Sequence, residues 1–379
     1  MNIAFDAARL LGYSGMNVYT RNLADSLCRL YEEDTYTMLT TYRRIEKVSA
    51  QFHGVARERL HWQNPLPNPL ALGAIGQPLT ERYINRVLGQ WSKRFDLLHA
   101  TDPFHFPPGI RNSAVTIHDL IPLYREQWVS ASMRRRIHRK ITAIARSSAI
   151  IFVPSHFVRT ELLEHFTIVP ERIVVTYEAS GEAFRPMNAS EVDLTKFGLT
   201  EEDTFFLYVG RIDIRKNIDR LVEAYANLPA ELRHAVKLVL IANGSPKDQE
   251  KFRARFLHHE GILHLTSVSD QDLARLLNRA LALAFVSLSE GFGIPVLEAM
   301  QSGCPVLTSN VSSMPEIAGD AAVLVDPYDV GEIQSSLLRL ATDSTLRLDL
   351  RHRGIERAKE FSWERCARET HAGYEAALS

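Results

Sequence analysis

The 379-residue sequence has few cysteines and almost no net charge. Its three cysteines, Cys28, Cys304 and Cys366, are too few and too scattered for a disulfide framework or a cysteine-based zinc site, which favours a reducing compartment. The formal net charge of -1 gives no overall attraction to nucleic acid or to acidic surfaces. We therefore expect no nucleic-acid partner.

Long hydrophobic runs are also lacking. No window offers the roughly 18 uninterrupted apolar residues of a membrane span, and the start, Met1 to Asp6, lacks the basic and apolar regions of a signal peptide. We expect a cytoplasmic protein. The one marked charge cluster, Arg134 to Lys140, is most simply a solvated helix face. The alternative is peripheral contact with an anionic membrane surface or a lipid-phosphate acceptor.

The length favours two domains, each large enough for its own core. Short apolar runs alternate with helical segments, which is typical of a parallel sheet wrapped by helices. We expect domains at residues 1–185 and 186–361, with residues 362–379 as a terminal helix that packs back on the first domain. The expected strands are 2–5, 36–40, 96–99, 114–117, 149–153, 172–176, 205–209, 236–241, 262–265 and 281–286.

The segment from Ser287 to Val306 carries the strongest local pattern. It follows the apolar run 281–286 and begins with a glycine-containing turn. Pro295 suits the first turn of a helix, and Gly303 suits the residue just past its end. This strand, glycine loop and helix would direct several backbone N–H groups at one spot, where an anion such as phosphate is expected.

Two carboxylates flank the same turn. Glu290 precedes it and Glu298 lies in the following helix. Both would repel a phosphate that they faced, so we expect them to bind hydroxyl groups instead. A ligand with phosphate at its centre and hydroxyl groups on both sides is a nucleotide-sugar. An ordinary turn with a solvated glutamate is the alternative.

The spacing of Glu290, seven residues and Glu298 around Gly291-Phe292-Gly293 resembles the signature of retaining glycosyltransferases of family 4. The resemblance implies the α/β fold called GT-B, in which two Rossmann-like parallel-sheet domains face each other across a cleft and a C-terminal helix crosses back. It implies that Glu298 binds the ribose, that Glu290 lies beside the transferred sugar, and that the loop through Ile294 holds sugar hydroxyls and phosphate.

Further matches to the family lie at other expected strand ends. Gly210-Arg211, four residues and Lys216-Asn217 match the family positions whose Arg and Lys bind the diphosphate, although surface cations are the simpler interpretation of the residues alone. In the family, the loop containing Val268 presents backbone groups to the base. Gly15 matches a glycine loop that faces the donor phosphates and the acceptor.

His118 follows the expected strand 114–117 directly, in the triplet His118-Asp119-Leu120. In the family this loop reaches the transferred sugar, so His118 is our candidate beside the acceptor, and a packed histidine is the alternative. The segment from His99 to His105 ends another strand and is either an acceptor-cleft wall or an irregular loop. We expect a long loop from Pro65 to Leu79.

The reaction implied is sugar transfer from a nucleoside diphosphate to a hydroxyl of a glycan or lipid-linked glycan. The resemblance favours mannose from GDP-mannose, in bacterial surface polysaccharide synthesis. We expect no metal cofactor, since no Asp-x-Asp pair of the kind that holds a divalent metal on a nucleotide was identified. The alternatives are a UDP-sugar donor, a GT-B epimerase or phosphorylase, and a non-catalytic nucleotide-sugar-binding protein.

Overall fold

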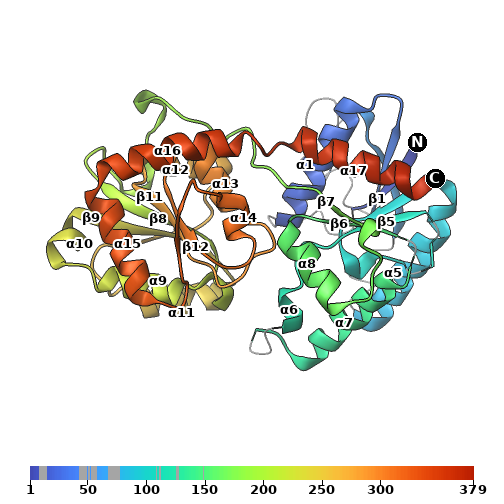
Figure 1. The fold of residues 1–379 in the computed structure, drawn as a ribbon, viewed down its shortest axis with the longest axis horizontal. Helices are drawn as coiled ribbons and strands as arrows, with labels where there is room; N and C mark the ends of the chain where they lie inside the picture. The colour runs from blue at the N-terminus through green and yellow to red at the C-terminus, as the bar shows by residue number, and fades with distance from the viewer. Residues whose placement is uncertain are drawn as a thin grey trace. The chain divides into compact units, whose positions relative to one another are not determined.

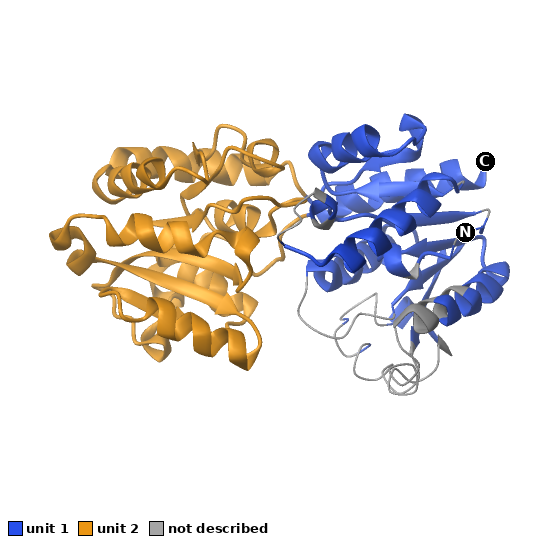
Figure 2. Ribbon diagram, turned by 90° about the horizontal axis from the view of Figure 1, so that it is seen from below, with its two compact units in different colours: residues 1–178, 362–379 blue, residues 179–361 orange. Residues whose placement is uncertain are grey.

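The computed structural model describes residues 1–7, 15–41, 49, 52, 58–66, 77–107, 109–110, 112–124, 128–147 and 149–379. The chain forms two compact units (Figure 2). The first comprises Met1–Glu178 and Ser362–Ser379, and the second comprises Ala179–Phe361. The first unit thus ends before the boundary expected at residue 185, and the terminal segment belongs with it.

A parallel sheet forms the centre of the first unit, with the strand order β3-β2-β1-β4-β5-β6-β7. Strands such as β6 read as unbroken apolar runs because helices cover both faces of the sheet. The strands are β1 (Asn2–Asp6), β2 (Thr35–Thr41), β3 (His61–Leu66), β4 (Leu97–Ala100), β5 (Ser113–Thr116), β6 (Ile150–Val153) and β7 (Ile173–Val175).

The terminal helix α17 (Trp363–Leu378) lies beside α1 (Gly15–Leu30) in this unit, and both chain ends lie there (Figure 1). Ser362 caps α17 by accepting a hydrogen bond from the backbone N–H of Arg365. The other described α-helices of the unit are α5 (Gln77–Trp91), α6 (Ile121–Tyr124), α7 (Ala131–Ala145) and α8 (His156–His165).

The second unit has a parallel sheet of order β10-β9-β8-β11-β12-β13 between two layers of helices (Figure 2). Its strands are β8 (Thr204–Arg211), β9 (Val236–Asn243), β10 (Ile262–Leu265), β11 (Ala282–Phe285), β12 (Val306–Ser309) and β13 (Val323–Val325). Its α-helices are α9 (Ile218–Ala226), α10 (Ala230–Ala235), α11 (Pro246–Phe256), α12 (Asp270–Arg279), α13 (Ile294–Gln301), α14 (Met314–Ala318), α15 (Val330–Thr342) and α16 (Ser344–Ala358).

The expected strands are all present, with ends shifted by a few residues. The expected loop from Pro65 to Leu79 is wrong at both ends, because β3 continues through Leu66 and α5 begins at Gln77. Its middle, residues 67–76, lies outside the described residues. The segment misled us because proline and glycine are frequent in it, although Pro65 lies in an edge strand, where a missing N–H is tolerated.

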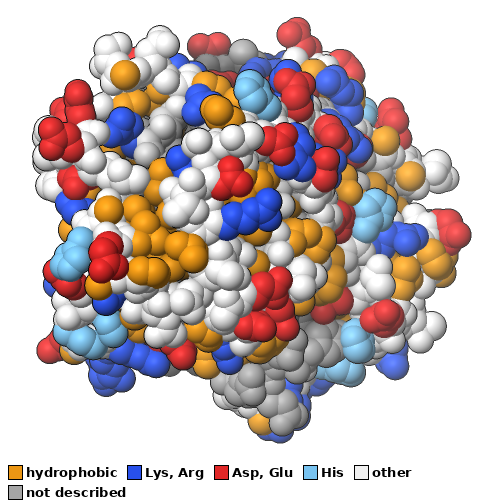
Figure 3. Space-filling view, turned by 60° about the vertical axis from the view of Figure 1, so that its left-hand side comes forward, with side chains coloured by type: hydrophobic (Ala, Val, Ile, Leu, Met, Phe, Trp, Pro, Cys, Tyr) orange, Lys and Arg blue, Asp and Glu red, His pale blue; other side chains and the backbone are white. Residues whose placement is uncertain are grey.

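Acidic and basic side chains are interspersed over the face drawn in Figure 3, as their nearly equal totals of 45 and 44 suggest. Beneath the surface, apolar side chains dominate. In the second unit they include Phe206, Leu221, Tyr225, Leu240 and Leu307, which come from both the sheet and the helices around it. Each unit therefore has its own core, as two-domain chains of this length require.

A hydrogen-bonded network of polar side chains crosses the core of the first unit. His99 is fully buried, and its Nδ1 lies 2.7 Å from the Tyr374 hydroxyl of α17. Its Nε2 lies 2.8 Å from Thr116 Oγ1, which is 3.1 Å from the Tyr19 hydroxyl. Burial, together with the charge of His118, lowers the pKa of His99 to about 3, so its ring is neutral. His99 therefore does not line a cleft, contrary to one of our two interpretations of its segment.

Tyr374→Phe tests this network. The substitution removes the hydroxyl that pairs with His99 Nδ1 and keeps the ring, so we expect a loss of about 1–3 kcal/mol in the free energy of unfolding, measured in urea. Tyr328→Phe, at a partly exposed ring, is the matched control and should change little. Equal stability of the two variants would contradict a structural role for the network.

Candidate functional site

The strand order of the second sheet changes direction at β8, which has β9 on one side and β11 on the other. Ligands of open parallel sheets bind beyond the carboxyl ends of the strands at such a point. Arg211 is the last residue of β8, and Lys216 follows it in a short 3-10 helix. Glu290 follows β11. Three of the predicted site residues thus come from the two strands that meet where a ligand is expected.

Hydrogen bonds fasten these two loops together. Leu288 N–H donates to Arg215 O at 2.8 Å, and the buried Asn217 side chain donates to Val286 O at 2.9 Å. As a result Lys216 Nζ lies 2.6 Å from Glu290 Oε1, and both side chains are nearly buried, with 13% and 12% exposed. The Lys216 ammonium also lies 4.8 Å from the centre of the Phe285 ring.

The glycine loop and helix have the predicted form. Gly293 has φ 107°, where a Cβ would lie 2.3 Å from Met314 Cε, so a larger residue would need this neighbour to move. Helix α13 begins at Ile294 with Pro295 in its first turn, and Gly303 follows its end with φ 73°. Gly291 and Phe292 are buried beneath the turn.

Two serines in the segment after β12 hold this loop by hydrogen bonds. Ser313 Oγ donates to Glu290 O at 3.0 Å and to Phe292 O at 2.9 Å, and Glu290 N–H donates to Ser312 Oγ at 3.2 Å. A serine just before a short helix commonly caps it. Ser313 precedes α14 but makes no capping side-chain hydrogen bond, and it holds the glycine loop instead.

Glu298 lies one turn into α13, and its carboxylate has no hydrogen-bond or ion-pair partner within the part of the chain that the structure describes. Burial raises the pKa of Glu298 to about 8, and the charge of Asp270 acts in the same direction. An unpaired carboxyl group with a strongly raised pKa beside a glycine loop is typical of a functional site.

Arg211 is exposed and, among the described residues, has no ion-pair partner. The glycine before it is required by packing, because a Cβ on Gly210 would lie 2.5 Å from the Tyr208 hydroxyl. Arg215, the next cation after Arg211 in the sequence, is partly buried and pairs with Asp213 at 3.3 Å. Val268 lies in the loop between β10 and α12 and is partly exposed.

In the first unit, His118 follows β5 as predicted, and the other groups around it come from different strands. Its Nδ1 lies 3.1 Å from Oε1 of Glu178, which follows β7. Gly15 begins α1, and a Cβ built on it meets no atom within 4 Å, so its surroundings are open. The loop before it, residues 8–14, lies outside the described residues.

A pocket of about 140 Å³ adjoins His118, and we call it the His118 pocket. Its wall combines apolar and charged groups that come from α1, α7 and the segments after β4 and β5. Asp102 and Phe104, which we placed either at an acceptor cleft or in an irregular loop, both line it. The lining residues are Met16, Asp102, Pro103, Phe104, His118, Asp119, Ile137, Lys140 and Ile141.

The basic segment Arg134 to Lys140 lies in α7, as a helix face should. Arg135, His138 and Arg139 are exposed, whereas Lys140 is buried and donates to Phe106 O at 2.9 Å. Lys140 is therefore not part of a solvated face. Membrane contact by the exposed side chains stays a prediction. None of the helices in the described ranges has the length and apolarity needed to cross a bilayer.

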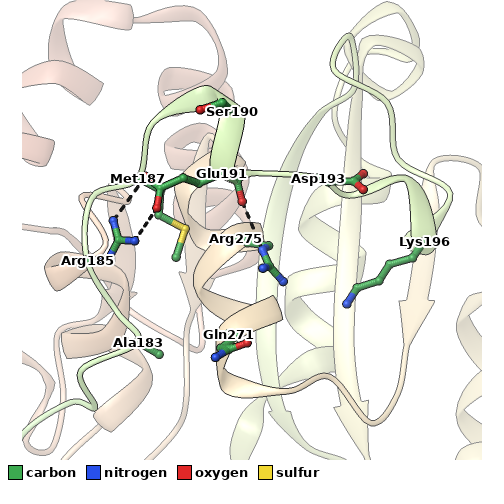
Figure 4. A pocket seen from close by; sticks show the side chains of 9 residues that line it. All are labelled: Ala183, Arg185, Met187, Ser190, Glu191, Asp193, Lys196, Gln271 and Arg275. Atoms are coloured by element: carbon green, nitrogen blue, oxygen red, sulfur yellow. Dashed lines mark hydrogen bonds and ion pairs between the residues drawn. The ribbon is translucent and has the colours of Figure 1, made fainter.

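A larger pocket, of about 670 Å³, lies between the segment 183–196 and α12 (Figure 4), and its lining includes none of the predicted site residues. Its cations are already paired: Arg185 with Glu191, and both Lys196 and Arg275 with Asp272. Asp272 also forms an Asp-x-Asp pair with Asp270 that our sequence reading overlooked, but it accepts from Ser269, Lys196 and Arg275. Within the described ranges, His, Cys, Asp and Glu do not gather in groups of three or more as metal ligands would.

Glu298→Gln tests how strongly the carboxyl group of Glu298 destabilises the folded chain as the pH rises. Because the pKa of Glu298 is raised, the native chain keeps a proton that the unfolded chain releases between pH 4.5 and about 8, so stability falls as the pH rises through that window. Because glutamine does not ionise, the variant lacks this loss of stability at high pH. Proton release over this window costs about 3–4 kcal/mol, so we expect the Tm difference between Glu298→Gln and wild type to grow by roughly 7–14 °C from pH 5 to pH 8.

The exposed Glu356 supplies the matched control, since Glu356→Gln should give the same small Tm difference at every pH. A pH-independent difference for Glu298→Gln as well would show that the carboxyl group of Glu298 is ionised normally.

Comparisons with known proteins agree with this geometry. The family described as "Glycosyltransferase Family 4" matches residues 13–179, and "Glycosyl transferases group 1" matches residues 190–361. The O-antigen chain mannosyltransferase B of Escherichia coli is 33% identical over 287 residues, which are 74% of each chain. The E. coli serotype-specific mannosyltransferase WbdA is 31% identical over 258 residues, which are 66% of this chain but only 32% of WbdA.

The fold also matches solved structures. The sucrose-phosphate synthase of Thermosynechococcus elongatus superposes with a TM-score of 0.77 at 18% identity, over 99% of this chain and 98% of that one. The two parallel-sheet units, the glycine loop between Glu290 and Glu298 and the matched relatives lead to one family. The chain belongs to the group 1 glycosyltransferases of family 4, and it is a GT-B glycosyltransferase.

Proposed function

We propose that the protein transfers mannose from GDP-mannose, with retention of the anomeric configuration, to a hydroxyl of a glycan or lipid-linked glycan in bacterial surface polysaccharide synthesis. The observation that carries the proposal is the pairing of Lys216 with Glu290 beside the glycine loop, at the point where β8 meets β11. The name of the E. coli relative supports mannose as the sugar.

The barrier to transfer lies in breaking the bond between the anomeric carbon and the diphosphate, on which negative charge develops. Arg211 and Lys216 neutralise this charge, together with the backbone N–H groups at the start of α13. These cations take the part that a divalent metal plays elsewhere, so transfer should proceed in the presence of a chelator. Glu298 receives the ribose hydroxyls, and Val268 faces the base.

Glu290 supports the sugar rather than attacking it. Its carboxylate is bound to the Lys216 ammonium, which lowers its nucleophilicity and places a negative charge near the developing oxocarbenium ion. Its backbone is fixed by Ser312 and Ser313. The loop can therefore keep Glu290 in place when the diphosphate competes for Lys216.

The His118 pocket accepts the sugar of the acceptor. It joins an aromatic ring, Phe104, to the carboxyl groups of Asp102 and Asp119, which suits a sugar with an apolar face and several hydroxyl groups. Asp102 is buried and accepts from Phe104 N–H at 2.8 Å, so the aromatic and the carboxylate are held together.

Nucleotide-dependent thermal stabilisation tests the donor. A ligand at 100 times its Kd adds about 2.7 kcal/mol, so GDP and GDP-mannose should raise the Tm of the wild type, and UDP and UDP-glucose should not. Glu298→Ala should lose the shift, because the ribose loses its carboxylate. Lys216→Ala should keep part of the shift and lose turnover, measured with EDTA present.

Asp320→Ala, at a largely exposed carboxylate of the same unit, is the matched control and should behave as wild type. A rise in Tm with UDP and UDP-glucose alone would leave glycosyl transfer as the proposed reaction and make a UDP-sugar the donor. A lack of any shift would favour a non-catalytic protein.

Phe104→Ala tests the acceptor pocket. Loss of the ring should raise the acceptor KM by about fivefold, corresponding to about 1 kcal/mol of stacking, and leave the donor KM unchanged. Tyr83→Ala, at an exposed ring of α5, is the control. An equal effect on donor and acceptor KM would contradict an acceptor role for the pocket.

A further inference from the structure

Glu178 is a buried carboxylate that neither motif of the chain includes. It is 4% exposed and ends the first of the two segments that form the first unit. Its side chain meets His118, with 3.1 Å between Oε1 and the ring Nδ1. Within the described part of the chain, His118 is its sole ion-pair partner.

The contact spans a strand. His118 follows β5 and Glu178 follows β7, and β6 lies between these two strands in the sheet. Since neighbouring strands are about 4.8 Å apart, the backbones of β5 and β7 are roughly 10 Å apart. The two side chains therefore extend toward each other over the carboxyl end of β6. This contact requires both side chains to be long enough to cross β6 and to point toward each other.

His118 is held from a second side by Tyr19. The two rings meet edge to face, with centroids 4.9 Å apart and an angle of 87° between their planes. Tyr19 is itself fixed, because its hydroxyl lies 3.1 Å from Thr116 Oγ1. The second ring nitrogen of His118, Nε2, is buried and has no hydrogen-bond partner among the described residues. His118 also lines the pocket assigned above to the acceptor.

A buried carboxylate without an Arg or Lys partner is costly unless its charge serves a purpose. If residue 178 only held the end of β7 against the sheet, a hydrogen bond would be enough and a charge would not be needed. The unsatisfied Nε2 is the second observation: a buried ring nitrogen normally has a partner. Together they indicate that the charge of Glu178 acts on His118, and that Nε2 has its partner only when substrate is bound.

We propose that Glu178 is a positioning residue that holds His118 in its charged form, with Nδ1–H donated to the Glu178 carboxylate and Nε2–H directed at an oxygen of the substrate. The contact between Nε2–H and the substrate rests on the proposed function, whereas the charge of His118 does not.

The carboxylates around His118 act in the same direction as Glu178, whereas the Lys140 ammonium on the wall of the same pocket acts against it. Burial alone would lower the pKa of His118, but the hydrogen bond and charge of Glu178, with the charges of Asp119 and Asp102, outweigh burial and raise it. His99, from β4, is neutral in its buried network, and Tyr19 contributes an uncharged ring. On balance the groups that face His118 favour its cationic form, because the carboxylates keep its pKa raised.

Glu178→Gln separates the charge from the hydrogen bond, because the amide oxygen can still accept from Nδ1–H. The titration of His118 is followed by NMR in histidine-labelled protein, assigned with His118→Asn. We expect Glu178→Gln to lower the titration midpoint by about one pH unit or more, and Glu178→Asp to restore part of it. Glu182→Gln, an exposed carboxylate in the following segment, should leave it unchanged.

The pH dependence of kcat/KM is measured on the same proteins. The alkaline loss of activity should move to lower pH in Glu178→Gln, so that kcat/KM at pH 8 falls roughly tenfold for a one-unit shift, while activity at pH 6 changes little. Glu178→Asp should again lie between the two. A structural role alone would lower activity equally at every pH.

An unchanged His118 midpoint in Glu178→Gln would overturn the positioning role. A moved midpoint with an unchanged pH dependence of kcat/KM would overturn the contact between Nε2–H and substrate. If the His118 midpoint moves as expected but the protein has no transferase activity, the proposed function is refuted and the positioning of His118 is supported. The two failures are therefore distinguishable.

Discussion

The ion pair between Lys216 and Glu290 depends on a constraint of the fold, and much of the second unit is arranged to meet it. Two loops from neighbouring parallel strands must stay in register over several residues without being part of the sheet. The hydrogen bonds from Leu288 to Arg215 and from Asn217 to Val286 supply that register. Asn217 adopts φ 56°, a conformation that asparagine tolerates better than most residues. Once the loops are fastened, the cation and the carboxylate meet as a consequence.

The sequence predicts best what depends on local backbone geometry. The glycine loop before α13, Pro295 in the first turn and Gly303 after the helix follow from properties of single residues, and the structure confirms them. Ten of the thirteen described strands are predicted for a similar reason, since buried parallel strands are short apolar runs wherever they occur, whereas β3, β12 and β13 were not predicted. The cation positions after β8 needed the family resemblance, because a lone Arg or Lys after a strand is usually solvated.

Contacts between residues far apart in the chain were harder to predict. Ser313 looked like a helix cap because serine before a short helix usually is one. Its role in holding Glu290 and Phe292 depends on how the loop after β12 passes the loop after β11. His99 looked like a cleft residue because it ends a strand, yet its partner Tyr374 is 275 residues away. Glu178 gave no signal at all, because only the sheet order shows that it reaches across β6 to His118.

Each of the two units holds a carboxyl group with few partners below its surface. Among the described residues, Glu298 of the second unit is half-buried and has no partner, and Glu178 of the first is buried with an imidazole as its sole ion-pair partner. Neither arrangement favours folding, because a buried carboxylate loses hydration that one weak partner does not replace. Both lie at the carboxyl ends of strands, where the sheet and its helices already provide a large apolar core. That core stabilises each unit enough to carry unsatisfied groups, and under the proposed function substrate hydroxyl groups and oxygens supply the partners that such groups lack. For the proposed sites, the Glu298 carboxyl group and Nε2 of His118 are therefore better guides to binding than the pocket of about 670 Å³ beside α12, whose cations are already paired.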